Sequence, residues 1–121
     1  MKRSMMQVYV KGSKEALALY KRAFDGRILA EYEDGDGGYM HAELDVQGQV
    51  VAVSEADEQT KMGNGMQFCF HYGEGGEKYV ERAYEVLKVG GEVVGPLGEC
   101  PFSPLMAAVI DKFGVYWCLF V

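Results

Sequence analysis

The segment Gln7–Gly26, QVYVKGSKEALALYKRAFDG, decides the fold because its hydrophobic pattern changes period part-way along. Its first residues belong to Met5–Val10, a short β-branched and aromatic run that is typical of a buried strand. Apolar residues then recur at helical spacing, and Ser13 is expected to cap a helix over residues 14–24. The final Asp-Gly pair ends that helix. A strand followed by a helix therefore opens the chain.

Three further strands are expected at residues 27–33, 39–46 and 49–54, separated by glycine-containing turns. The middle strand alternates cleanly between apolar and polar side chains. One side is expected to carry Met40, Ala42, Leu44 and Val46, and the other His41, Glu43 and Asp45. The first half of the chain thus has the order βαβββ.

The second half repeats this order, with a helix over 77–89 and strands at 66–72, 92–94, 105–110 and 115–121. Three pairs of matching features occur in the same order and at similar offsets: Gln7 with Gln67, Gly26 with Gly91, and the D-x-x-G pattern of Asp45–Gly48 with that of Asp111–Gly114. We therefore predict an α+β fold of two βαβββ modules in one domain, residues 1–121. Module one spans about 5–54 and module two about 65–121.

Composition excludes several classes of function. With 18 acidic and 12 basic residues in 121, the net charge of −6 disfavours binding to nucleic acid or to an anionic membrane surface. No apolar run approaches the length of about 20 residues that spans a membrane. The cysteines Cys69, Cys100 and Cys118 are odd in number and have no CxxC spacing, which favours reduced thiols in a cytoplasmic protein.

Three segments, Glu15–Gly26, His41–Leu44 and Ile110–Trp117, resemble the vicinal-oxygen-chelate superfamily, and in particular its PhnB-like branch. This superfamily has the glyoxalase, bleomycin-resistance and extradiol-dioxygenase fold. The resemblance implies that the two mixed sheets form one cup, with the helices on its convex side and a ligand in its concave face. The methyltransferase label common in this branch gains no support, because the chain has no glycine-rich strand-turn-helix signature for a methyl-donor domain.

Strand alternation then selects the side chains expected to face the cup, if the helices cover the more apolar face of each sheet. These residues are Gln7, Tyr9, His41, Glu43, Ala52, Ser54, Gln67, Cys69, His71, Tyr116, Cys118 and Phe120.

The metal-binding positions implied by the resemblance fall on Gln7, Ala52, Gln67 and Cys118. Alanine has no donor atom, the two amides are weak neutral donors, and a lone thiol suits Mg²⁺, Mn²⁺ or iron poorly. We therefore expect neither a metal nor another cofactor. A relocated metal site, formed by His41 and His71 together with Glu43 or Cys118, stays an alternative.

His41 and Glu43 lie two residues apart on one strand, so they are candidates for a general acid and base. The alternative is a polar pair that lines a wet sheet face or a dimer seam. Cys69 could act as a nucleophile helped by His71, or it could simply pack as a small hydrophobic residue. The proline-containing segment 98–104 is interpreted either as a lid or as an edge crossing without ligand contact.

Two functions follow from this reading. The first is a metal-independent enzyme that uses acid/base chemistry on a small organic molecule, and the second is a non-catalytic binding or sequestration protein of the bleomycin-resistance type. A homodimer is expected as well, because 8 Tyr, 6 Phe and 1 Trp exceed what so small a core encloses.

Overall fold

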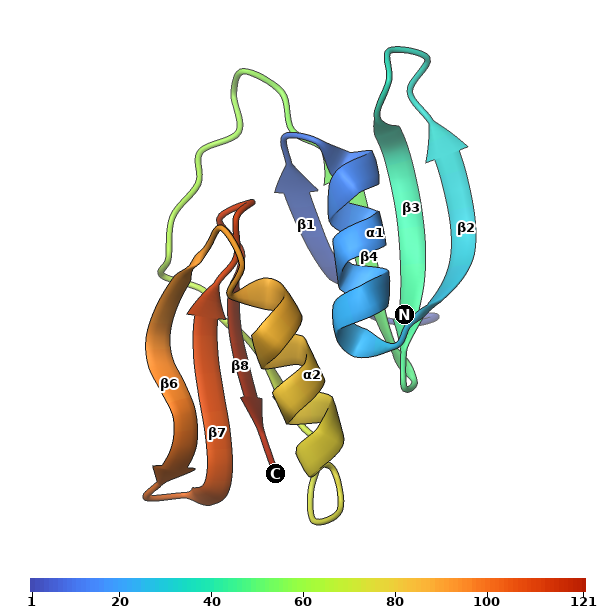
Figure 1. Cartoon of the computed structure of the whole chain (residues 1–121). Coiled ribbons are helices and arrows are strands. Elements are labelled where there is room, and N and C mark those ends of the chain that lie inside the picture. Colours follow the sequence, from blue (N-terminus) through green and yellow to red (C-terminus); the bar gives the residue numbers. More distant parts are fainter. The chain divides into compact units, whose positions relative to one another are not determined.

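The computed structural model describes all 121 residues, which divide into two compact units, Met1–Lys61 and Met62–Val121. Each unit contains one four-stranded mixed sheet and one helix in the order βαβββ, as Figure 1 shows. The predicted α+β fold of two βαβββ modules is confirmed. That the two sheets join into one cup stays a prediction of the resemblance. Neither helix has the length and apolar character needed to cross a membrane.

Module one orders its strands β1-β4-β3-β2, with β1 parallel to β4 and the other pairs antiparallel. Helix α1 packs on β1, β3 and β4 and buries a stripe that includes Leu17, Tyr20 and Phe24. The elements are β1 Met6–Val10, α1 Ser13–Phe24, β2 Arg27–Glu33, β3 Tyr39–Val46 and β4 Gln49–Glu55.

Module two has the equivalent order β5-β8-β7-β6, and helix α2 packs on β7 and β8. Its core is built around Trp117, which is fully buried and contacts the rings of Phe68 and Phe70. The elements are β5 Phe68–His71, α2 Glu77–Leu87, β6 Glu92–Cys100, β7 Ser103–Ile110 and β8 Tyr116–Phe120.

The start of helix α1 is stabilised differently from the expected serine cap. Ser13 is the first helical residue, and its hydroxyl is buried between the Tyr39 backbone N–H and the Glu55 carboxylate. That carboxylate, at the end of β4, accepts the backbone N–H groups of Gly12 and Ser13 at 3.0 and 2.9 Å. A residue more than forty positions along the chain therefore supplies the cap, which a local sequence pattern does not reveal.

A β-bulge corrects the expected orientation of Met40. The register between β2 and β3 passes from Tyr32 opposite His41 to Glu33 opposite Tyr39, so that Met40 is the extra residue. Tyr39 is buried in its place, whereas Met40 is exposed. The other three residues expected on the helix side of this strand, Ala42, Leu44 and Val46, are buried.

The late proline-containing segment is part of a β-hairpin. Strand β6 continues through Pro96 to Cys100, and a turn at residues 101–102 leads directly into β7. Because β6 is an edge strand with register shifts, it can accommodate a residue without a backbone N–H. Of the two interpretations of residues 98–104, the edge segment agrees with this arrangement.

Strand register also defines how the modules correspond. Gln7 pairs with Ala52 in module one, and Cys69 pairs with Cys118 in module two. Ala52 and Cys118 each lie four residues after the glycine of the D-x-x-G turn. The counterpart of Gln7 is therefore Cys69, two residues beyond the Gln67 that the sequence match selected.

Candidate functional site

Each sheet has a face that points away from its helix, which we call the distal face. In module one, the register places Gln7, Ala52 and Glu43 side by side across β1, β4 and β3. Tyr9 pairs with Ser54 one step along, and continuing the β3–β4 register by one residue brings His41 opposite Ser54. All six residues predicted for this module thus share its distal face.

Hydrogen bonds on this face form two adjoining groups. The Gln7 amide Nε2 donates to Ser54 Oγ at 3.1 Å and to the Val8 carbonyl at 3.0 Å. The His41 ring Nε2 lies 2.9 Å from Glu43 Oε1. The predicted His41–Glu43 pair is therefore a direct hydrogen-bonded contact.

Arg3 completes this second group. Its Nη1 and Nη2 donate to Glu43 Oε2 and Oε1 at 2.9 and 2.7 Å, a two-point contact between guanidinium and carboxylate. Sequence reasoning missed Arg3 because it precedes the first strand. A signal was present, since Arg3 has the same alternation phase as Gln7 and Tyr9 if the chain is extended before β1.

The environment of Glu43 defines its chemical role. The residue is 7% exposed, and the hydrogen bonds from Arg3 and then from His41 lower its pKa to about 2. A carboxylate of that pKa is a poor proton acceptor at neutral pH. Glu43 instead holds the Nε2 side of His41, whose other ring nitrogen, Nδ1, has no hydrogen-bond partner within the protein. The imidazole is about one-third exposed.

The distal face of module two has a different character. Cys69 Sγ lies 3.7 Å from Gln67 Oε1, while the His71 ring stacks on Phe120 with centroids 4.5 Å apart. No hydrogen bond joins Cys69 to His71, so the activated thiol considered from the sequence is not formed. The six residues predicted for this module share one strand phase: Gln67, Cys69, His71, Tyr116, Cys118 and Phe120.

Cys118 is the inert thiol of this face. Burial is the main reason why its pKa is raised to about 11, with a further contribution from the neighbouring Cys69. Cys69 is exposed, and all three cysteines are free thiols. A buried thiol with a raised pKa is a packing group and not a nucleophile.

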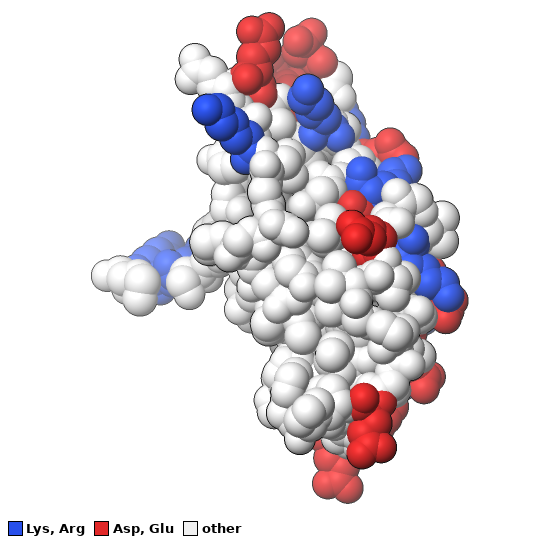
Figure 2. All heavy atoms as spheres, turned by 90° about the vertical axis from the view of Figure 1, so that its left-hand side faces the viewer, with Lys and Arg blue, Asp and Glu red and all other residues white.

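The charged surface shows no continuous basic area on the face drawn in Figure 2, where Lys and Arg side chains lie among Asp and Glu side chains. The chain as a whole carries a net charge of −6.

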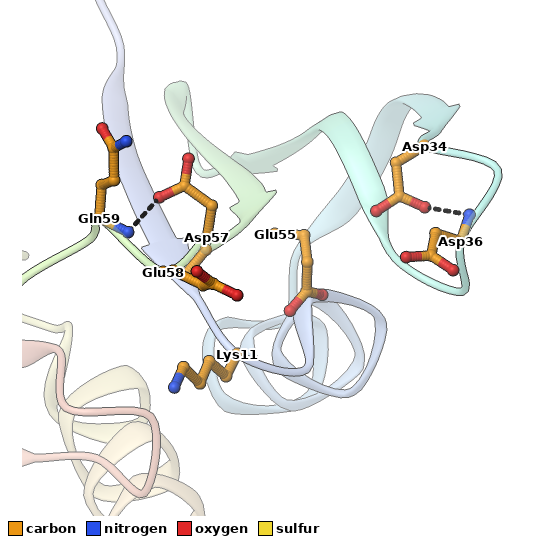
Figure 3. A pocket seen from close by; sticks show the side chains of 8 residues that line it. Lys11, Asp34, Asp36, Glu55, Asp57, Glu58 and Gln59 are labelled. Carbon is orange, nitrogen blue, oxygen red and sulfur yellow. Dashed lines mark hydrogen bonds between the residues drawn. The ribbon is translucent and has the colours of Figure 1, made fainter.

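Module one also has a pocket of about 780 Å³ that sequence reasoning did not predict. Figure 3 shows Lys11 at this pocket among several carboxylates. Two of the carboxylates already bind backbone N–H groups: Asp34 accepts those of Asp36 and Gly38, and Glu55 those at the start of α1. These contacts lower the pKa of both acids. The pocket is lined by Lys11, Asp34, Asp36, Glu55, Ala56, Asp57, Glu58 and Gln59.

The sequence profile of the Glyoxalase/Bleomycin resistance protein/Dioxygenase superfamily matches residues 3–119. The chain belongs to this superfamily. No curated protein matched the chain significantly.

Several solved structures resemble the chain over nearly its whole length. Protein PA1353 of Pseudomonas aeruginosa is 22% identical, with a TM-score of 0.82 over 99% of this chain and 97% of that one. A putative 3-demethylubiquinone-9 3-methyltransferase of Bacillus cereus, a PhnB protein, is also 22% identical, with a TM-score of 0.79 over 98% of both chains. At these identities the likeness concerns the fold.

A third structure is a variant of the fosfomycin resistance protein FosX of Listeria monocytogenes, in complex with Mn(II) and a dihydroxypropylphosphonic acid. It is 16% identical, with a TM-score of 0.64 over 98% of this chain and 87% of that chain. Because that protein of similar fold holds Mn(II), the donors of the present chain are compared with those that a metal requires.

The donor set does not fit a hard divalent cation. The resemblance placed the four positions at Gln7, Ala52, Gln67 and Cys118, and the strand register corrects Gln67 to Cys69, which pairs with Cys118. Gln7 offers only a neutral amide oxygen, Ala52 offers no donor atom, and a buried thiol of raised pKa resists ionisation. No three His, Cys, Asp or Glu side chains come together anywhere in the chain in a group that could hold a metal ion.

Proposed function

We propose that this glyoxalase-superfamily protein binds a small organic molecule on the distal face of module one, where His41 exchanges a proton with it. The observation that carries the proposal is the 2.9 Å contact between His41 Nε2 and an ionised Glu43. This contact fixes the ring so that Nε2 carries the hydrogen and Nδ1 is the basic atom. Nδ1 takes a proton from the ligand, and the resulting imidazolium is stabilised by Glu43.

The polar groups around His41 favour a particular ligand chemistry. The charges of Arg3 and Glu43 compensate each other, so the site selects for a neutral or weakly polar molecule. Two N–H groups of Arg3 bind Glu43, which leaves three guanidinium N–H groups as donors, because Arg3 has no other partner. A molecule with an acceptor oxygen near a removable proton suits this combination of donors and base.

The experiment begins with native mass spectrometry of the purified protein to identify a molecule that co-purifies with it. The recovered molecule is then incubated with the wild type, with His41→Ala and with the control His71→Ala, whose ring stacks on Phe120 in the other module. We expect conversion by the wild type and the control, and retained binding without conversion by His41→Ala. Conversion that is unchanged in His41→Ala would contradict the proposed role of His41.

Sequestration without catalysis is the second candidate, and the resemblance to bleomycin-resistance proteins favours it. Recovery of an unaltered molecule that neither the wild type nor any variant converts would support this candidate. Binding on the distal face of module one is common to both functions, so Ser54→Leu, which fills that face, is expected to weaken binding in either case.

We further propose a cytoplasmic homodimer. Support comes from three free cysteines and from exposed apolar side chains, among which Tyr32, Met40 and Phe102 are each at least 60% exposed. Sedimentation at micromolar concentration is expected to give twice the chain mass of 13.4 kDa. A monomer mass would reject the dimer.

A further inference from the structure

The N-terminal segment places one side chain on the distal face of module one. Arg3 precedes β1, yet its guanidinium binds Glu43 on β3, with β4 between those two strands. The residue paired with both Gln7 on β1 and Glu43 on β3 is Ala52 on β4, whose side chain is small and uncharged.

We propose that Arg3 is the positioning residue of His41: it clamps both oxygens of Glu43, and Glu43 in turn holds the Nε2 side of the imidazole. The inference rests on the proposed function of His41 and adds the N-terminal segment to that site. Arg3 acts through Glu43, since its hydrogen bonds go to Glu43 and not to the ring.

Among the groups around Glu43, Arg3 is the one that always carries a positive charge. The residues paired with Glu43 on the neighbouring strands are Ala52 on β4 and Ala30 on β2, and neither carries charge. From β1, Gln7 is engaged with Ser54 and Val8. His41 is the remaining partner, and its charge depends on pH. Without Arg3, the 7% exposed carboxylate would lose its two-point contact and its fixed orientation.

Oxygen Oε1 of Glu43 accepts hydrogen bonds from both Arg3 and His41, at 2.7 and 2.9 Å. A guanidinium fork orients the carboxylate plane, whereas a lysine ammonium provides charge without that geometry. Arg3→Lys therefore separates the two contributions. It keeps the positive charge near Glu43 but loses the clamp.

Nuclear magnetic resonance of the ligand-free protein tests the proposal. The Glu43 carboxyl carbon reports its titration, and the His41 Nε2–H proton reports the hydrogen bond by its slow exchange with water. The variants are Arg3→Gln and Arg3→Lys, with Lys2→Gln as the matched control for loss of a nearby charge. His71 is the one other histidine and serves as an internal reference for folding.

In the wild type and in Lys2→Gln, we expect Glu43 to stay ionised until the pH approaches about 2 and the Nε2–H signal to be visible. In Arg3→Gln, the carboxyl titrates at a higher pH and the Nε2–H signal broadens into water exchange. Arg3→Lys retains part of the low titration but loses the protected proton. If Arg3→Gln matches Lys2→Gln in both readouts, Arg3 does not position the site. All measurements are made without ligand, so failure of the proposed function would be seen separately.

Discussion

The two modules carry different chemistry on equivalent positions of their two sheets. In module one these positions hold Gln7, Glu43 and His41 around the small Ala52, and in module two they hold Cys69, Ala108 and Met106 around Cys118. In module one, Glu43 binds Arg3 and holds the His41 ring by a hydrogen bond. In module two, the corresponding positions hold apolar and sulfur-containing side chains. At these positions the duplicated fold is thus polar in module one and apolar in module two.

The helix-facing sides show why such divergence is tolerated. They are closely packed in both modules, with Phe24 and Leu44 fully buried in one and Trp117 and Leu119 in the other. Packing there determines the fold, because a buried side chain has little freedom to change size. The distal faces contribute less to packing and can specialise. The comparison predicts that equivalent substitutions in the two modules have unequal effects.

The largest difference is expected at the D-x-x-G turns. Asp111 is 2% exposed and accepts the backbone N–H groups of Phe113 and Val115 and the Trp117 Nε1–H at 2.8 to 3.1 Å. Asp45 accepts the Gly48 N–H at 3.1 Å. Asp111→Ala leaves a buried indole N–H unpaired and should lower the free energy of unfolding by about 3 kcal/mol, against about 1 kcal/mol for Asp45→Ala. Urea denaturation of both variants measures this difference, and equal losses would contradict it.

The second prediction concerns Cys69 and Cys118, two free cysteines that lie opposite each other on neighbouring strands of module two. A pKa of about 11, raised from 9.0, reduces the thiolate fraction of Cys118 about 100-fold at pH 8. We expect iodoacetamide to label exposed Cys69 first, and labelling of Cys118 to rise tenfold per pH unit up to about pH 11. Mass spectrometry of peptides from a timed reaction measures both rates. Cys69→Ser removes part of the cause and should speed labelling of Cys118; comparable rates for both cysteines in the wild type would refute the prediction.

The glycines that follow the two helices provide a third, smaller contrast. A Cβ added at Gly91 would meet the backbone carbonyl of Ile110, whereas at Gly26 it would meet the flexible Leu44 side chain, with Leu44 Cγ at 2.8 Å. Backbone yields less easily than a rotamer, so Gly91→Ala should cost about 2–3 kcal/mol and Gly26→Ala about 1 kcal/mol. Thermal denaturation of the pair checks this ranking, and a larger loss for Gly26→Ala would reverse the interpretation.

Acid stability provides a fourth test, specific to module one. The folded-state pKa of Glu43 lies at about 2, below the ordinary 4.5, so its ionised form stabilises the fold above pH 4.5. That contribution disappears as the pH falls from 4.5 to 2. Because Arg3 is about half exposed, we expect a loss of about 1 kcal/mol. Urea unfolding at pH 5.5 and pH 2.5 should show this extra loss of stability in the wild type and not in Glu43→Gln. An equal loss of stability in both proteins would contradict the prediction.

How much the sequence revealed differs between the core and the sites. Both helices were predictable from their 3.6-residue period, and the His41–Glu43 contact from the alternation of one strand. The bulge at Met40 was not, because an uninterrupted alternation gives no sign of the extra residue. Arg3 was missed because its contact depends on the packing of a segment outside any regular element. Strand β6 resembled a loop because its prolines and glycines are tolerated at a sheet edge.

The last prediction is that removing metal ions has no effect on stability. It concerns the possible metal-ligand positions of both modules. The purified protein should contain no stoichiometric divalent metal, and EDTA should leave its thermal midpoint unchanged. A tight metal would add about 2.7 kcal/mol at 100 times its dissociation constant, an amount that thermal denaturation detects. The positions at issue provide one alanine, one neutral amide and two thiols. These groups compensate a hard cation poorly for the loss of its bound water.

Near-equimolar Zn, Mn, Ni or Fe in elemental analysis, together with a midpoint that falls on adding EDTA, would overturn this expectation. Two variants would then assign the metal to a module, since His41→Ala removes the imidazole donor of module one and Cys118→Ser removes a thiol of module two. Loss of metal in His41→Ala alone would mean that the cation displaces Arg3 from Glu43, because both need the same carboxylate oxygens. Loss in Cys118→Ser alone would mean that the buried thiol ionises for a soft metal despite its raised pKa. Either result would mean that the two modules differ chiefly in whether they bind a metal, and not in the polarity of the equivalent positions compared above.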